Sequence, residues 1–153
     1  MKPLSFDLPE LDQKKTKEAV EAALEKYRLF KYLTFEEREA SITASPEERF
    51  HGPTNQTSDQ TAQVAIYNAD QQEYRRQYCE RIERAVKRLP PLERFLIERR
   101  YMAEDAEHKT DLKVYSFEFQ PPISYGTYAK HRWKAFYKLA LSLNIAVQKK
   151  LNE

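Results

Sequence analysis

The chain has 153 residues, of which 41% are hydrophobic, and a formal net charge of +2 at pH 7. That length is enough for one well-packed core, or for a small domain with an appended arm. Its single cysteine excludes an intrachain disulfide. No secretory signal or apolar run of about 18 residues occurs, so we expect a cytoplasmic protein that does not enter a membrane. Two glycines and few alternating apolar runs favour an all-α fold.

The charge is unevenly distributed along the chain. Residues 1–70 hold 9 Lys and Arg against 13 Asp and Glu, and residues 71–153 hold 17 against 11, so the two parts carry −4 and +6. Such asymmetry is typical of an acidic or neutral arm joined to a basic binding module.

The N-terminal part predicts one amphipathic helix that Asp12 can cap and that runs to about Leu33. Its apolar stripe consists of Leu11, Ala19, Ala23, Leu24, Tyr27 and Phe30. The pattern leaves open whether this stripe packs on the rest of the chain, on a second copy in a homodimer, or on another protein.

A polar segment rich in Ser, Thr, Pro, Glu and Asn follows, from residue 34 to residue 59. We expect a short helical turn at 35–40 and then a flexible linker. So long an insertion without apolar periodicity is unusual inside a compact domain. We therefore predict an N-terminal helical arm at 1–40, a linker at 41–60 and a C-terminal helical domain at 61–153.

Apolar residues recur at helical spacing from residue 61 to Leu89, and Pro90 and Pro91 end this second helix. Cys79 lies on its stripe, where we expect an inert, partly buried thiol. Pro91 can begin a third helix that continues to Met102. Two helices joined by a tight proline turn are therefore predicted.

Residues 103–109 form a charged connector. Thr110 or Asp111 can cap a short helix that reaches Phe119, although the propensities of residues 114–119 equally favour a strand, so both remain open. Gln120-Pro121-Pro122 predicts a turn before the last helix.

The last helix is predicted to begin after Ser124, its cap, and to continue past Leu143 through Ile145 and Val147. At about 100° per residue, its apolar side chains share one face. That face holds Tyr128, Ala135, Phe136, Leu139 and Leu143, and the opposite face holds Gly126, Thr127, Lys130, Trp133, Lys134 and Tyr137. No carboxylate side chain occurs between Glu118 and Glu153, so the field here is positive.

A short helix, a turn with an apolar residue, a capping Ser and a helix with a cationic outer face match the outline of a helix-turn-helix, which binds double-stranded DNA. Ile123 would fill the core beneath the turn. We expect base-edge contacts from Gly126, Thr127 and Lys130, and phosphate contacts from Lys134 and Lys138. The predicted DNA-binding set is completed by Ser124, Tyr125, His131 and Trp133.

Two members of this set have alternative roles. His131 is either a hydrogen-bonded histidine in the core or at its boundary, or a phosphate or base contact. Trp133 either contacts the DNA backbone or a partner, or packs on the third helix.

Two resemblances are carried by particular segments. Leu89-Pro90-Pro91-Leu92-Glu93-Arg94-Phe95-Leu96-Ile97-Glu98-Arg99-Arg100-Tyr101 resembles the opening of a sigma-factor region 4 domain, and Ile123-Ser124 with residues 135–139 resembles its recognition-helix end. The chain as a whole resembles the ArpU-type phage late-gene regulators of Gram-positive bacteria, through residues 8–12, 16–21, 64–68, 99–102 and 134–140. This second resemblance implies a sequence-specific activator of phage packaging, structural and lysis genes.

Enzyme chemistry is not expected. Two glycines cannot build a phosphate-binding loop, the three histidines stand far apart without metal-ligand spacing, and Ser124 has no base at a recognisable spacing. We therefore expect no cofactor, metal or small-molecule substrate. Two alternatives remain: a phage adaptor or packaging protein that acts through protein contacts, and a sigma-like factor that needs the RNA polymerase core of the host.

Overall fold

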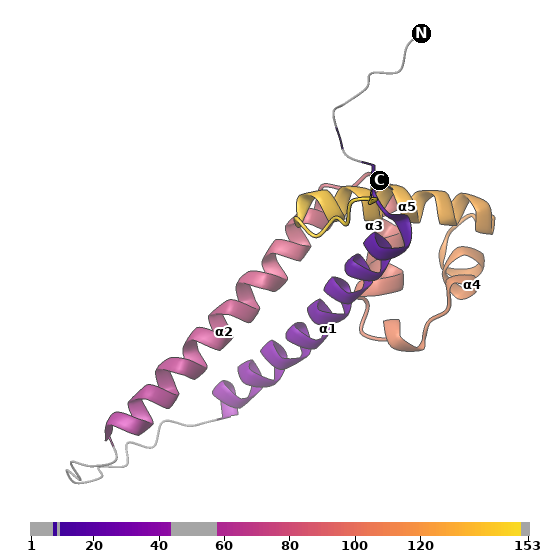
Figure 1. Ribbon diagram of the computed structural model, residues 1–153. Coiled ribbons are helices and arrows are strands. Elements are labelled where there is room, and N and C mark those ends of the chain that lie inside the picture. Colours follow the sequence, from indigo (N-terminus) through magenta and orange to yellow (C-terminus); the bar gives the residue numbers. More distant parts are fainter. Residues whose placement is uncertain (1–7, 9, 44–57, 151–153) are drawn as a thin grey trace.

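The computed structural model describes residues 8, 10–43 and 58–150, and these form an all-α fold (Figure 1). The elements are helices α1 (Gln13–Thr43), α2 (Ser58–Lys87), α3 (Pro91–Ile97), α4 (Asp111–Lys113) and α5 (Tyr125–Ser142), the π-helical turns η1 (Glu98–Met102) and η3 (Val114–Glu118), and the 3-10 turn η2 (Ala106–His108). The predicted fold class is confirmed.

Helices α1 and α2 form a long hairpin that extends away from a head made of the elements from α3 to α5 (Figure 1). The prediction that the first helix ends near Leu33 is wrong, because α1 continues to Thr43. No glycine or proline interrupts residues 34–43, and an ion pair between Glu37 and Arg75 of α2 holds this part.

Residues 41–43 and 58–60, at the two ends of the predicted linker, are helical. Residues 44–57 lie outside the described residues. The flexible linker and the division into arm and DNA-binding domain therefore stay predictions.

The apolar stripe of the first helix packs in the hydrophobic core of its own chain. One cluster of buried side chains joins α1, α2 and the head. Its members include Val20, Leu24 and Tyr27 of α1, Ile82 and Val86 of α2, and Tyr128, Phe136 and Leu139 of α5. The N-terminal helix therefore packs on its own chain.

The segment after α5 returns to the start of α1. The prediction that the last helix continues through Val147 is wrong, because Asn144 adopts a left-handed conformation with φ of 58°. The Ile145 amide donates to the Ala140 carbonyl at 2.9 Å, which closes the helix end. The buried Thr16 hydroxyl then donates to the Val147 carbonyl and accepts from the Val147 amide, both at 3.2 Å.

The segment that could be a helix or a strand is helical. Thr110 caps α4, because its hydroxyl accepts a hydrogen bond from the Lys113 amide at 3.2 Å. η3 follows directly, with Val114 buried and Phe117 exposed. The strand alternative for residues 114–119 is therefore wrong, and a short helical element precedes α5 as the helix-turn-helix outline requires.

Truncation of Leu24 tests whether α1 and the head fold as one unit. Leu24 is 0% exposed, so Leu24→Ala should lower the free energy of unfolding by about 2–5 kcal/mol. Unfolding should stay a single transition when the fluorescence of Trp133, the only tryptophan, is compared with far-UV circular dichroism. Tyr32→Ala, at a 61% exposed position of α1, is the control. A Trp133 transition unchanged by Leu24→Ala would show that the head folds without α1.

Candidate nucleic-acid interface

The start of α5 is fixed by its cap. The Ser124 hydroxyl accepts a hydrogen bond from the Thr127 amide at 3.2 Å and donates to the Thr127 hydroxyl at 3.0 Å. Ser124 is thus the predicted cap. Tyr125 is 56% exposed and packs edge-on against Tyr115, while a Cβ added at Gly126 would meet nothing within 4 Å. The first turn of α5 therefore presents an open surface.

The outer face of α5, defined as Gly126, Thr127, Lys130 and Lys134, is exposed along its whole length. Within the described part of the chain, Lys130 and Lys134 have no hydrogen-bond or ion-pair partner. The opposite face carries the buried residues predicted from the sequence, namely Tyr128, Ala135, Phe136, Leu139 and Leu143. Two cations are therefore free to meet an external anion.

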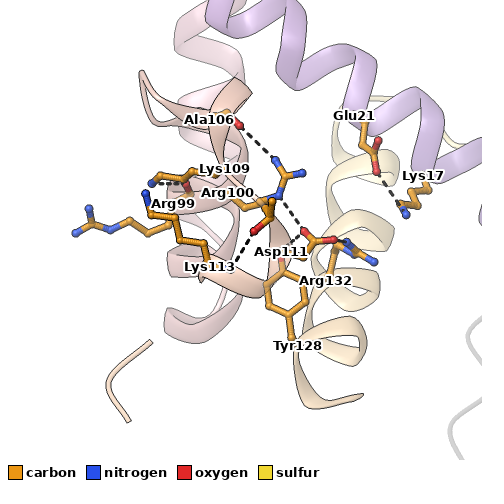
Figure 2. A network of polar contacts seen from close by, with 11 residues as sticks. Lys17, Glu21, Arg99, Arg100, Ala106, Lys109, Asp111, Lys113, Tyr128 and Arg132 are labelled. Atoms are coloured by element: carbon orange, nitrogen blue, oxygen red, sulfur yellow. Dashed lines mark hydrogen bonds and ion pairs between the residues drawn. The ribbon is translucent and has the colours of Figure 1, made fainter. Parts of the chain in front are cut away.

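Asp111 of α4 fixes the position of α5 (Figure 2). Its Oδ1 accepts hydrogen bonds from the Tyr128 hydroxyl at 2.8 Å and from Arg100 Nε at 2.9 Å, and its Oδ2 accepts one from Arg132 Nη1 at 2.9 Å. These donors come from α5 and η1. One carboxylate thus ties three elements together. We call this the Asp111 clamp, with Arg100, Tyr128 and Arg132 as its other members.

The contacts of the clamp shift the pKa values of Asp111 and Tyr128. Burial raises the pKa of Asp111, but the hydrogen bond from Tyr128 and the charges of Arg132 and Arg100 outweigh it, so this pKa lies below its usual value. Burial and the hydrogen bond to Asp111 raise the pKa of Tyr128. Asp111 is therefore a carboxylate, and Tyr128 a neutral donor, at neutral pH.

The charged connector holds a second polar contact that the sequence did not reveal. Lys109 is 6% exposed, and its ammonium donates to the Arg99 carbonyl and to Glu118 Oε1, both at 2.9 Å. Asp105 lies 3.3 Å from the same ammonium. The spacing of Asp105, Lys109 and Glu118 gives only a weak hint of this contact, which joins η1 to η3.

Lys138, a predicted phosphate contact, has an ion-pair partner within the protein. Its ammonium lies 2.8 and 3.1 Å from the carboxylate oxygens of Glu93, which is 3% exposed. A buried carboxylate that lost this partner would be strongly destabilising. Lys138 therefore holds α3 against α5, and its charge is already neutralised within the protein.

Trp133 is partly buried and packs against the core cluster, and its ring lies edge-on to that of Tyr137 with the ring centroids 6.2 Å apart. A hollow of about 390 Å³ next to it is lined by Gln13, Lys14, Lys17, Ala129, Arg132, Trp133 and Phe136. The sequence did not predict that cations of α1 would flank α5. His131 is also partly buried, and its role stays a prediction.

Within the described ranges, no group of His, Cys, Asp and Glu side chains could hold a metal ion. No helix of the described part is long and apolar enough to span a membrane. Cys79 is a buried free thiol, and burial raises its pKa, which agrees with the inert thiol expected.

Sequence comparison gives one informative similarity. The chain is 27% identical over 144 residues to the "uncharacterized phage-related protein Lin1259/Lin1739" of Listeria innocua serovar 6a, and the alignment covers 94% of this chain and 97% of that protein. No family model and no solved structure matches the chain. The likeness thus extends over nearly the full length of both proteins.

Removal of the Asp111 charge should weaken the fold in a pH-dependent way. Because three charged or polar donors lose their carboxylate, Asp111→Asn should lower the free energy of unfolding at pH 7 by about 1.5–3 kcal/mol. The folded pKa lies below the unfolded value of about 3.9, so this contribution is complete above that value and is lost as the pH falls through the folded pKa. Denaturant titrations should therefore show a constant difference in the free energy of unfolding between the wild type and Asp111→Asn from pH 5 to 8. The two free energies should converge in stronger acid.

Glu107→Gln, at an exposed position with no partner in the described part of the chain, is the control and should be neutral. Equal stability of the wild type and Asp111→Asn at pH 7 would contradict the assigned clamp.

Proposed function

We propose that this protein is a sequence-specific, double-stranded-DNA-binding transcriptional activator that places α5 in the major groove. The observation that carries the proposal is the exposed outer face of α5, whose two lysines have no ion-pair partner among the described residues, on a helix without a carboxylate side chain. The proposal includes no enzymatic activity, cofactor or small-molecule substrate.

The shape of α5 suits a groove. A helix with its side chains is about 10–12 Å across, and the major groove is about 12 Å wide. Gly126 leaves the first turn free of a side chain, so the backbone there can approach base edges closely. Thr127 and Lys130 follow on the same face and offer hydrogen bonds to bases.

The charges around α5 suit the two phosphate strands that border a groove. Lys134 lies one turn beyond Lys130, where the helix leaves the groove towards the backbone. On the flank of α5 that Trp133 occupies, Lys14 and Lys17 of α1 lie beside the same hollow. We assign these cations to phosphate contacts, which would make binding strongly dependent on salt.

We further propose which genes this protein regulates. The similarity to a phage-related protein supports a phage or prophage origin. The resemblance of the segments quoted above to ArpU-type regulators supports activation of late genes for packaging, structure and lysis. Host RNA polymerase is then the expected protein partner of the DNA-bound form, and a sigma-like factor is the variant in which DNA binding needs that polymerase.

The alternative is an adaptor that acts through protein contacts. It is favoured by large apolar side chains that α1 and α2 leave exposed, among them Leu29, Tyr32 and Tyr67. Titration of the purified protein with RNA polymerase, or with other phage proteins, in the absence of DNA would detect such an adaptor.

The outer face of α5 is tested by Lys130→Ala combined with Lys134→Ala. Binding to a fluorescent random-sequence duplex, followed by anisotropy at several salt concentrations, should weaken in the double variant. The slope of log affinity against log salt should fall by about 1.8, since each phosphate contact contributes about 0.9. Lys31→Ala combined with Lys87→Ala removes two exposed hairpin lysines and should change little. An unchanged slope in the α5 variant would refute the assigned face.

Gly126→Glu separates binding from folding. The added side chain enters open space, so the midpoint of denaturant unfolding should stay close to that of the wild type. A carboxylate at the first turn would repel phosphates and block the close approach, so DNA affinity should fall at least tenfold. Gly126→Ala, which adds only a methyl group, should retain the fold and most of the binding. Full affinity in Gly126→Glu would place the DNA on another surface.

A further inference from the structure

Among the residues that the structure describes, no other element covers the outer half of the α1–α2 hairpin. Every side chain from Asp59 to Asp70 of α2 is exposed. Isolated helices gain little from propensity alone, and most helical stability comes from packing of an apolar face. This half of α2 nevertheless carries Val64, Ile66 and Tyr67, which are between 59% and 63% exposed.

Tyr67 belongs to an aromatic face on one side of the hairpin, defined as Lys26, Leu29, Phe30, Tyr67 and Tyr74, in which Phe30 is partly buried. Phe30 of α1 packs edge-on against Tyr74 of α2 with ring centroids 5.9 Å apart. The Lys26 ammonium donates to the Tyr74 hydroxyl and lies over the Phe30 ring. Leu29 lies about one helical turn after Lys26 in α1, and Tyr67 lies about two turns before Tyr74 in α2. Leu29 is 55% exposed and Tyr67 is 63% exposed.

The same side of α2 has a heptad spacing. Positions three and four residues apart, which face one direction on a helix, are Gln60, Gln63, Tyr67, Asp70, Tyr74, Gln77, Arg81 and Arg84, and Arg88 follows one residue beyond the end of α2. Asp70 lies between the two tyrosines, and the arginines follow them, with Arg81 also donating to the Leu143 carbonyl at 3.0 Å. The two tyrosines supply the apolar contacts of this stripe, and its other positions supply charged and amide groups that a second helix could meet.

The charges of α2 show which helix fits. Residues 58–74 contain Asp59, Asp70 and Glu73 and no Lys or Arg. The C-terminal half is rich in cations, and Arg84 and Arg88 have no carboxylate partner within the described part of the chain. An antiparallel copy of α2 therefore brings the acidic half of one helix to the basic half of the other, whereas a parallel copy opposes like charges.

We propose that two copies of this chain associate through antiparallel α2 helices, with the aromatic faces at the centre of the interface. With Tyr74 at the two-fold axis, Tyr67 of one chain lies opposite Arg81 of the other, and Asp59 lies near Arg88. A two-fold axis makes each of these contacts twice. Since α2 of 30 residues is about 45 Å long, the two heads lie at opposite ends and both α5 helices stay accessible.

The first test is the mass in solution. Light scattering of the full chain should give twice the 18.2 kDa of one chain. Tyr67→Glu combined with Tyr74→Glu should give a monomer. Its far-UV circular dichroism per residue should match that of the wild type, and it should unfold in a single transition. Phe117→Ser, which removes a 71% exposed aromatic ring from the head, should stay dimeric. A monomeric wild type at every soluble concentration, or a dimer that survives the tyrosine changes, would overturn the proposal.

The second test concerns orientation, and it uses cysteines at the two ends of the stripe. Chains with Gln60→Cys mixed with chains with Arg88→Cys should form a disulfide-linked dimer under mild oxidation, and neither variant should do so alone. The native Cys79 is 5% exposed, so its background is small. Cross-linking of Gln60→Cys with itself would show a parallel pair and overturn the antiparallel arrangement. Neither test involves DNA, so the proposed function can fail or stand independently.

Discussion

Asp111 lies where η1, α4 and α5 meet, and its carboxylate decides how the last helix is presented. The three donors that converge on it come from both sides in the chain, since Arg100 precedes it and Tyr128 and Arg132 follow it. Hydrogen bonds to a charged group are stronger than neutral ones, and a half-satisfied network would be costly. The angle between α4 and α5 is therefore set by charge as well as by apolar packing.

Around this point the apolar core extends into the hairpin. Leu24 and Tyr27 of α1 contact the same cluster as Phe136 of α5, and the C-terminal segment is held against the start of α1 by Thr16. The two ends of the described chain thus stabilise each other. The first turns of α1 lie against the head and bring Lys14 and Lys17 beside α5.

The sequence predicted those features that depend on local periodicity. The cap at Ser124, the cap at Thr110, the proline turn before α3 and the buried face of α5 all follow from residues close together in the chain. Features that depend on distant residues were not predictable. The ion pair of Lys138 with Glu93, the burial of Lys109 and the position of Trp133 beside α1 each need the tertiary arrangement.

The sequence also led to wrong predictions at two helix ends and left one short segment undecided between helix and strand. Residues 34–43 are polar, so the sequence predicted only a short helical turn at 35–40 and then a linker, yet they contain no glycine or proline to end the helix. Residues 114–119 have strand propensity. However, Thr110 caps α4, and η3 continues directly from α4, so residues 114–118 are helical. At Asn144, tolerance of a left-handed conformation ended the helix although apolar residues continue.

DNA binding through the outer face of α5 can be mapped residue by residue in solution. The ¹⁵N-labelled full chain is titrated with a short duplex, and the backbone amide chemical shifts are followed. We expect the largest shift changes from Gly126 to Lys134, smaller ones at Lys14 and Lys17, and none in the hairpin beyond Leu29. Changes confined to the hairpin, or none in α5 at saturating duplex, would contradict binding through this face.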